Sequence, residues 1–235
     1  MTPRVSVVIP VYNEGDTIGV CLGRLLDAIT LPCEILVVYD SVDDTTRPYV
    51  EKIAKDEPRV VPTLNTLGRG PAYAIRYGIE HAAADVVVVT MADGSDDPTQ
   101  VDALTHLVER GVVVAAASRY MPGGRQIDGP FVKSTFSRFA GVTLCWFARV
   151  GTHDATSSFK GYDRAFIQEV GIESEAGFEI AIELVAKARR RRRPVAEIPT
   201  IWLERTTGAS NFKMWKWLPR YFHWYFYAFG PKMGS

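Results

Sequence analysis

The most constraining feature of this chain is a series of short, nearly uninterrupted apolar runs that alternate with amphipathic segments in its first half. The runs occupy residues 5–9, 34–39, 59–63, 86–90 and 112–118. Segments with helical spacing of apolar residues lie between or after them, at 15–29, 45–56, 70–83 and 99–110. Strands without polar alternation are covered on both faces, and alternation with helices produces parallel strands with right-handed crossovers. The sequence therefore predicts an α/β fold with a mostly parallel central sheet and helices on both faces.

The bulk composition supports one sizeable domain and excludes some classes of function. The chain has 235 residues, 47% of them hydrophobic, and its formal net charge of zero gives no reason to expect a nucleic-acid partner. Cys21, Cys33 and Cys145 lack the spacing of a metal site or a disulfide framework, which is typical of a reducing compartment. The first residues enter a strand without a signal peptide, and no run of about 18 apolar residues indicates a membrane-spanning helix.

The second half of the chain is less regular. Residues 129–151 and 177–193 have the apolar spacing of helices, and a proline at 194 ends the second. Residues 195–203 are predicted to be extended, and Pro199 indicates a strand at the edge of a sheet. The segment 212–230 is dense in aromatic residues.

Polar residues follow the predicted strands where parallel strands present their carboxyl ends, which is where such sheets bind ligands. They are Tyr12 to Glu14, Asp40, Asn65 to Gly70, Asp93 to Asp97, and Arg119. Glu14 and Asp40 have the chemistry to accept hydrogen bonds from a base and a ribose, although helix capping explains such residues as well. Gly68 and Gly70 suit a phosphate at a helix start, although a plain turn is the simpler interpretation of a lone Gly-x-Gly. The first strand leads to "PVYNEG" and not to a dinucleotide fingerprint, which argues against a nicotinamide or flavin enzyme.

The stretch "VVVVTMADGSDDP" at 86–98 places Asp93, Asp96 and Asp97 directly after a buried strand. Carboxylates in this position commonly hold a divalent cation over a phosphate. Met91, however, stands where a tight Asp-x-Asp pair would have its first carboxylate. Taken alone, the stretch is consistent with a metal site, with an incomplete metal site, or with a polar turn.

Several motifs together are more specific than any one of them. The first half contains, in order, "VSVVIPVYNEGDTI", "EILVVYDSVDDTT", "NTLGRGPAYAIRYG", "VVVVTMADGSDDP" and "ASRYMPGG". They resemble the family 2 inverting glycosyltransferases of GT-A fold. In the second half, "DATSSFKGYDRAF", "GFEIAIELVAKA" and "VAEIPTIWLERTTGASNF" are similar to the polyprenyl-phosphate branch, typified by dolichol-phosphate mannose synthases. The resemblance covers residues 4 to 213. It implies a catalytic domain at 1–213, with a nucleotide-sugar half (1–120) and an acceptor half (121–213), followed by a tail at 214–235.

The resemblance also implies roles for the residues along the rim. The donor, a GDP- or UDP-hexose, would be held by Pro10, Tyr12, Glu14, Asp40, Gly68, Arg69, Gly70, Ala92 and Asp93. Asp93 matches the second aspartate of the family's Asp-x-Asp motif, and would bind Mg²⁺ or Mn²⁺ together with Ser95, which stands at a metal-contacting glutamine of the family. A cation that bridges the diphosphate stabilises the charge that develops on the leaving group.

This sequence departs from the family pattern at three places. The usual "VVDDGS" is "VVYDSV" here, so Tyr39 replaces the first acid and Asp40 keeps the second. The usual "DADLQ" is "MADGS", which leaves Asp96 or Asp97 to compensate for Met91. The "G-x-SK" signature is "GASN", so the nearest lysine is Lys213.

The acceptor implied by the resemblance is a polyprenyl phosphate, which is already ionised and needs cations more than a strong base. Arg119, Arg205 and Ser210 match family positions near the phosphates, and arginine suits forked phosphate contacts. Asp154 and Lys213 are further candidates for the acceptor site. Glu183 matches the acidic residue of the family's "Q-x-E" motif and is the candidate catalytic residue of this helix. Glu179 lies one turn earlier, and either would serve as base for a hydroxyl acceptor.

Membrane contact is expected from the aromatic tail, whose mixture of aromatic and basic residues suits the interface plane of a bilayer. A tail folded against the core is the competing interpretation. The run of arginines at 189–193 is consistent with a solvated helix end, and also with a segment that attracts anionic lipid headgroups. We therefore expect a peripheral enzyme on the cytoplasmic face of a membrane, alone or with a membrane-protein partner.

The sequence thus predicts an inverting transferase that moves a hexose, mannose or glucose, from a nucleotide diphosphate to a polyprenyl phosphate. A hydroxyl acceptor in polysaccharide or glycolipid synthesis is the first alternative, with Glu179, Glu183 or Asp154 as base. A nucleotide-sugar-binding module without catalysis is the second. A sugar nucleotidyltransferase is disfavoured because its Gly-rich signature is absent after the first strand.

Overall fold

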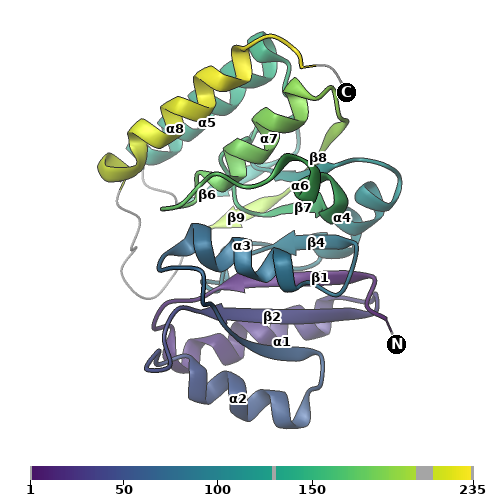
Figure 1. Ribbon diagram of the computed structural model, residues 1–235, viewed down its shortest axis with the longest axis vertical. Helices are drawn as coiled ribbons and strands as arrows, with labels where there is room; N and C mark the ends of the chain where they lie inside the picture. Colours follow the sequence, from purple (N-terminus) through teal and green to yellow (C-terminus); the bar gives the residue numbers. More distant parts are fainter. Residues whose placement is uncertain (1, 129–130, 205–213, 234–235) are drawn as a thin grey trace.

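A computed structural model describes residues 2–128, 131–204 and 214–233 (Figure 1). Its centre is a seven-stranded sheet in the order β3-β2-β1-β4-β7-β5-β8. These strands are β1 (Val5–Pro10), β2 (Cys33–Tyr39), β3 (Val60–Leu64), β4 (Val86–Val89), β5 (Val114–Ser118), β7 (Lys160–Asp163) and β8 (Val195–Pro199). Neighbours pair in parallel except at β7, which is antiparallel to both β4 and β5. The predicted mostly parallel sheet is confirmed.

Helices cover both faces of the sheet, as the uninterrupted apolar strands require. One core contains β1 residues Val5, Val7 and Ile9 and is closed by α1 (Ile18–Ala28), α2 (Arg47–Asp56) and α4 (Gln100–Glu109). The other contains Val8 and is closed by α3 (Pro71–His81), α6 (Arg164–Val170) and α7 (Ile180–Arg190). In Figure 1, α3 lies on the near side of the sheet and α1 on the far side. A Cβ at Gly78 would stand 2.4 Å from Val8 Cγ1, so glycine permits the close approach of α3 to β1.

Strand β7 was not expected from the sequence, because its four residues, "KGYD", do not form an apolar run. It inserts between β4 and β5 and joins the two halves of the sheet. Strand β8 lies at the edge of the sheet, as predicted from Pro199. A separate parallel ladder pairs β6 (Arg125–Ile127) with β9 (Ile201–Leu203). The amide of Leu203 donates to the Ser95 carbonyl at 3.1 Å, which brings this ladder against the loop that follows β4.

The helix predicted at 129–151 consists of α5 (Phe131–Thr143) and a short π-helix, η2 (Leu144–Ala148), which ends at Arg149 with φ +56°. The aromatic tail forms α8 (Met214–Phe229), which packs on α7 and on η2. Trp224 and Ala228 are buried there, and the Tyr225 hydroxyl donates to Thr143 Oγ1 at 3.0 Å. The inner face of α8 thus belongs to the core. Among the described residues, no helix combines the length and apolar character needed to cross a bilayer.

Candidate active site

The carboxyl ends of β1, β2, β4 and β5 meet at one end of the sheet, on the left in Figure 1, and carry most of the predicted site residues. At β2, the Asp40 carboxylate accepts from the Gly70 amide and from Asn65 Nδ2, each at 2.7 Å. Asn65 Nδ2 also donates to the Gly68 carbonyl at 2.7 Å. Asp40 therefore shapes the 65–70 loop and sets the start of α3. Gly70 needs its φ of +116°, and a Cβ there would stand 3.0 Å from the Ala176 carbonyl oxygen.

The β1 loop lies beside the β2 loop. The Asn13 amide, at a residue with φ +54°, donates to both Asp44 carboxylate oxygens at 3.1 and 3.2 Å. The Glu14 amide donates to Thr46 Oγ1 at 2.9 Å. These contacts hold Tyr12 in an exposed position, with 62% of its surface accessible. Pro10 is buried at the end of β1, and Arg69 is exposed on the neighbouring loop.

The loop after β4 is folded by its own aspartates. Asp93 Oδ1 accepts from the Ser95 hydroxyl at 2.6 Å and from its amide at 3.1 Å. Asp96 Oδ2 accepts from Thr90 Oγ1 at 2.9 Å and from the Met91 amide at 3.1 Å. Burial, and next the charge of Asp93, raise the pKa of Asp96 to about 7. Ala92 is buried between these groups, so Asp93 is the carboxylate that the loop presents at the strand end.

A divalent cation at this loop would depend on Asp93 and Ser95, whose oxygens are the ligand type that Mg²⁺ and Mn²⁺ prefer. Across residues 2–128, 131–204 and 214–233, no three His, Cys, Asp or Glu side chains are grouped so as to hold a metal. Met91 contributes a thioether where the family pattern has a carboxylate. The donor set fits a cation that a diphosphate and water also coordinate, and it does not fit one held by protein side chains alone.

At β5, Arg119 and Asp154 form a buried ion pair. Arg119 Nε donates to Asp154 Oδ2 at 2.7 Å, and Nη2 donates to Oδ1 at 2.9 Å. Asp154 is fully buried; burial alone would raise its pKa, but the Arg119 charge outweighs this and lowers it. Arg119 also lies 4.8 Å from the Tyr120 ring and 5.9 Å from the Trp202 ring. Among the described residues, none accepts a hydrogen bond from Nη1 of Arg119.

A buried lysine on β7 completes this ion-pair cluster and was not singled out in the sequence. Lys160 is fully buried, and its Nζ donates to the backbone carbonyls of Asp154, at 2.9 Å, and Ser157. Burial lowers the pKa of Lys160 to about 7. The sequence signal for it was weak, because a lysine within "SSFKGYD" has no feature that distinguishes it from a surface residue.

At the start of α7, Glu183 is buried and its carboxylate is engaged by three donors. These are the amides of Glu173 (2.7 Å) and Ser174 (2.8 Å) and Lys187 Nζ (2.7 Å). Glu183 therefore holds the 173–176 segment against α7. Glu179 is also buried, and its Oε1 accepts from the Ala176 amide at 3.1 Å.

Three predicted site residues, Arg205, Ser210 and Lys213, lie outside the described residues. The loops carrying Asp40, Asp93 and Arg119 follow strand ends at one end of the sheet, and the Ala176 carbonyl, just before α7, lies close to Gly70 of the loop that Asp40 supports. Arg119 and Asp154, predicted separately, contact each other.

The profile of glycosyl transferase family 2 matches residues 6–171 of the chain. The chain belongs to this family. The family 2 glycosyltransferase is 30% identical over 217 residues to polyprenol monophosphomannose synthase of Mycolicibacterium smegmatis, covering 89% of this chain and 81% of that one. It is 28% identical over 214 residues to undecaprenyl-phosphate mannosyltransferase of Micrococcus luteus, covering 88% and 87%. The predicted likeness to polyprenyl-phosphate mannose synthases is confirmed.

The fold of this family 2 glycosyltransferase also resembles a solved structure. That structure is glucosyl-3-phosphoglycerate synthase of Mycobacterium tuberculosis in complex with Mn²⁺, uridine diphosphate and phosphoglyceric acid. The TM-score is 0.68 at 16% identity, and the match covers 97% of this chain and 79% of that one. The predicted GT-A fold is confirmed.

Proposed function

We propose that this family 2 glycosyltransferase moves a hexose with inversion from a nucleotide diphosphate to a polyprenyl phosphate. The observation that carries the proposal is the meeting of the Asp93 loop with the buried Arg119–Asp154 pair at one end of the sheet. This arrangement sets a carboxylate for a diphosphate-bound cation beside a fixed guanidinium for a phosphate. Support for the acceptor comes from the two relatives, whose names specify polyprenol and undecaprenyl phosphate.

On the donor side, the exposed Tyr12 and the Asp40-supported loop are proposed to bind the base and ribose, with Gly70 near the phosphates. Asp93 and Ser95 would hold Mg²⁺ or Mn²⁺. When bound, such a cation neutralises the charge that develops on the leaving diphosphate. The amide and hydroxyl of Ser95 keep the Asp93 carboxylate oriented before the ligand arrives.

On the acceptor side, Arg119 is proposed to orient the attacking phosphate through Nη1 while Asp154 fixes the other edge of the guanidinium. An ionised phosphate needs no strong base. The engagement of Glu183 by three donors of this chain agrees with this, because its carboxylate is already used in holding the 173–176 segment.

The acceptor class is tested by supplying one labelled nucleotide hexose with either a polyprenyl phosphate or the matching polyprenol. We expect label to enter an organic-soluble, mild-acid-labile product with the phosphate alone. Transfer to the polyprenol or another hydroxyl, with none to the phosphate, would replace this proposal with the hydroxyl-acceptor alternative. Nucleotide binding without turnover or donor hydrolysis would favour the non-catalytic alternative.

Restoring the missing carboxylate should strengthen metal binding. In the presence of the nucleoside diphosphate, Met91→Asp is expected to tighten Mn²⁺ binding about tenfold, because charged oxygen ligands raise affinity for hard cations. Electron paramagnetic resonance of free Mn²⁺ measures this directly. Met91→Asn is the matched control without the added charge. Equal Mn²⁺ affinity in the two variants would show that position 91 lies outside the coordination sphere.

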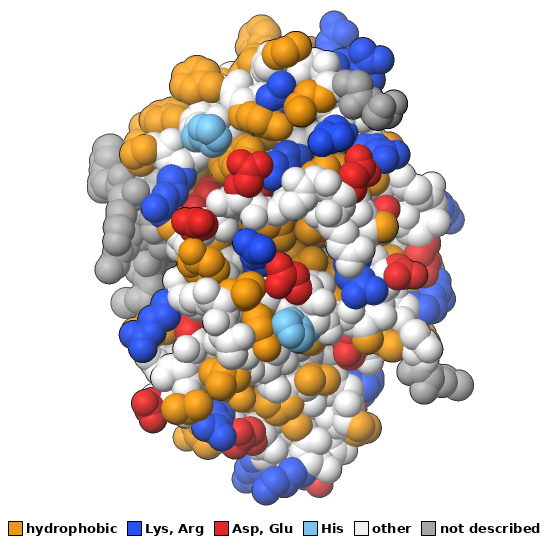
Figure 2. Space-filling model, viewed as in Figure 1, with side chains coloured by type: hydrophobic (Ala, Val, Ile, Leu, Met, Phe, Trp, Pro, Cys, Tyr) orange, Lys and Arg blue, Asp and Glu red, His pale blue; other side chains and the backbone are white. Residues whose placement is uncertain are grey.

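The membrane-facing surface in this proposal is the outer face of α5, η2 and α8. The exposed aromatic residues described on it include Phe136, Phe139, Trp146, Phe147, Phe222 and Phe226, which are 47–75% accessible. Figure 2 shows hydrophobic side chains gathered along α8. Arg138, Arg149 and Arg220 are exposed on the same elements. Aromatic side chains interspersed with arginine suit the headgroup region of a bilayer.

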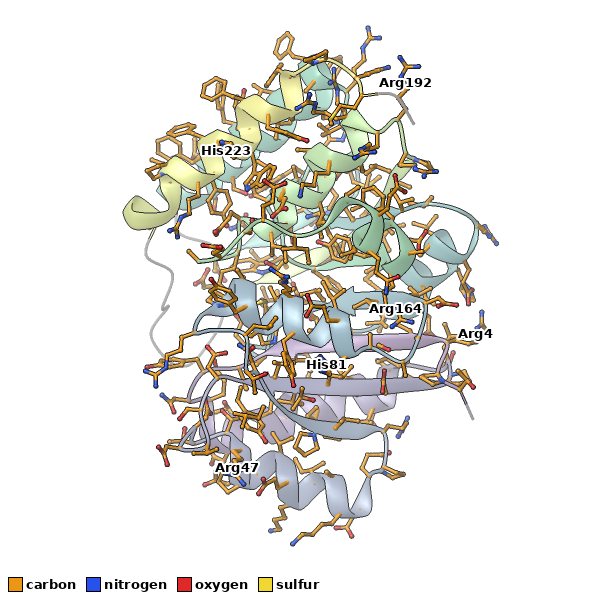
Figure 3. The ribbon with its side chains drawn as sticks, in the orientation of Figure 1. Arg4, Arg47, His81, Arg164, Arg192 and His223 are labelled. Carbon is orange, nitrogen blue, oxygen red and sulfur yellow. The ribbon has the colours of Figure 1, made fainter. Side chains whose placement is uncertain are left out.

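The arginine run contributes less to this surface than its sequence suggests. Arg189 donates to the carbonyls of Ala148 and Gly230, and Arg190 donates to Pro231 at 3.0 Å. Arg191 and Arg193 both pair with Glu169. The side chains of four of the five arginines therefore bind parts of this chain. Among the described residues, no side-chain partner is found for Arg192, which is labelled in Figure 3.

The double substitution Trp146→Ser/Phe147→Ser should reduce flotation with anionic vesicles at least about fivefold, since it removes two exposed aromatic side chains. The matched control is Val20→Ser on α1, at a position that is 71% exposed, like Trp146. Sedimented and floated fractions are compared in the same gradient. Undiminished flotation of the double variant would mean that η2 does not face the membrane.

A further inference from the structure

Four buried oxygens without hydrogen-bond partners border the proposed site. Within the described part of the chain, such side-chain atoms are Asp102 Oδ1, Ser174 Oγ, Glu179 Oε2, Thr200 Oγ1 and Glu204 Oε2. Asp102 lies on α4, away from the site. The amide of Thr200 donates to Ser118, the neighbour of Arg119, and Glu204 follows the residue that contacts Ser95. A buried polar atom without a partner is destabilising, so its presence calls for a ligand or another explanation.

Of these atoms, Glu179 Oε2 is the one whose chemistry most narrowly limits the kind of partner it can have. Glu179 is 1% exposed and stands at the amino end of α7, whose first backbone amides carry partial positive charge. Its Oε1 accepts a hydrogen bond from the Ala176 amide at 3.1 Å and so supports the preceding loop. Its Oε2 has no hydrogen-bond partner among the described residues. An ionised carboxylate oxygen only accepts hydrogen bonds, and its partner must therefore be a donor.

Two groups near Glu179, the Ala176 carbonyl and the Tyr221 side chain, connect it with the proposed site. The Ala176 carbonyl faces Gly70, the residue that Asp40 places at the start of α3. Tyr221 of α8 is a further neighbour: burial and next the Glu179 charge raise the pKa of its hydroxyl, while the Arg119 charge acts in the opposite direction. The segment that leads to Glu179 thus faces the donor loop, and Tyr221 is close enough to respond to the charges of both Glu179 and Arg119.

We propose that Glu179 determines sugar specificity by accepting, at Oε2, a hydrogen bond from a hydroxyl of the transferred hexose. This rests on the proposed function, in which the donor is a nucleotide diphosphate hexose. The diphosphate and the ionised acceptor phosphate are themselves acceptors and would repel the carboxylate. In the proposed function the cation is assigned to Asp93 and Ser95, which lie on a different loop. Of the groups that meet at the reacting bond, the hexose is the one that carries hydroxyls able to donate a hydrogen bond.

Glu179→Gln separates this role from support of the loop. The amide oxygen of glutamine can still accept from Ala176, whereas its NH₂ group replaces the acceptor at Oε2 with a donor. The matched control is Glu175→Gln, which removes the same charge from an exposed position of the same segment. Calorimetry in Mn²⁺ compares binding of the nucleoside diphosphate with binding of its hexose conjugate, for the guanosine and uridine series.

For Glu179→Gln we expect the affinity for the nucleotide hexose to fall about tenfold or more, and the affinity for the nucleoside diphosphate to change less than about twofold. Glu175→Gln should change neither. Equal weakening of both ligands, or of neither, would overturn the inference.

A second measurement does not depend on the variant's stability. Among donors that each lack one hexose hydroxyl, one should bind the unmodified protein about tenfold more weakly than the complete donor. Uniform affinity across that series would overturn the inference. If the unmodified protein binds neither nucleoside diphosphate nor nucleotide hexose, the proposed function fails, and this inference with it.

Discussion

Asp93→Asn is expected to lower the rate of hexose transfer by about a hundredfold to a thousandfold. The substitution removes the carboxylate charge that the loop after β4 presents, while the asparagine oxygen can still accept from Ser95 at the positions where Oδ1 now does. Loss of a group that stabilises charge developing on a leaving group has effects of this size. Initial rates at saturating donor and Mn²⁺ measure it.

The control for Asp93→Asn is Asp97→Asn, four residues along the same loop. Asp97 Oδ1 accepts from the Thr99 amide at 3.1 Å and from its hydroxyl at 2.8 Å, contacts that an asparagine oxygen reproduces. We expect the Asp97 variant to keep most of its activity. Comparable rates in both variants would remove Asp93 from the proposed metal site and return Asp96 or another group to consideration.

Asp154→Asn is expected to lower the free energy of unfolding by about 3–5 kcal/mol, because it leaves Arg119 buried without its counter-charge. Both Asp154 carboxylate oxygens accept hydrogen bonds from the Arg119 guanidinium, at 2.7 and 2.9 Å. Lys160 is buried beside this pair and donates to the Asp154 backbone carbonyl. The same variant should also bind the acceptor phosphate poorly, since the guanidinium is no longer fixed. Urea denaturation followed by circular dichroism measures the stability.

The matched control is Glu109→Gln, in an ion pair of the same length but on the surface. Arg4 Nη2 stands 2.7 Å from Glu109, and the two side chains are 44% and 31% exposed. Figure 3 shows Arg4 at the opposite end of the sheet from the site. Exposed pairs contribute up to about 1 kcal/mol, so the loss should be that or less. Similar losses in the two variants would contradict the view that burial sets the importance of the Arg119–Asp154 pair.

Much of the sheet could be predicted because its strands are buried on both faces and therefore consist of unbroken apolar runs. Strand β7 could not be predicted, because a short segment with a lysine, a glycine and an aspartate is typical of a turn at the surface. Lys160 is nevertheless fully buried, because backbone carbonyls accept from its ammonium group. The hydrogen bonds that offset the burial of this charge are formed by tertiary contacts, which the local sequence pattern does not reveal.

The site was predictable to the extent that it follows strand ends. Asp40, Asp93 and Arg119 lie at the expected rim because topology alone fixes those positions. The partners of these residues were not predictable. Asp154 is 35 residues from Arg119 in sequence, and the engagement of Glu183 depends on how the 173–176 segment folds over α7. The aromatic tail has one buried and one exposed face. The interpretation of a tail folded against the core is confirmed for the buried face, and membrane contact of the exposed face stays a prediction.

The most direct test of the central claim is the anomeric configuration of the product formed from an α-linked nucleotide diphosphate hexose and a polyprenyl phosphate. Proton NMR of the purified lipid product gives the configuration at C1. A single displacement at the Asp93 and Arg119 site predicts a β-linked polyprenyl phosphate hexose, formed by the unmodified protein and strongly reduced in Asp93→Asn. An α-linked product, or no polyprenyl phosphate hexose from any nucleotide hexose tested, would contradict the account.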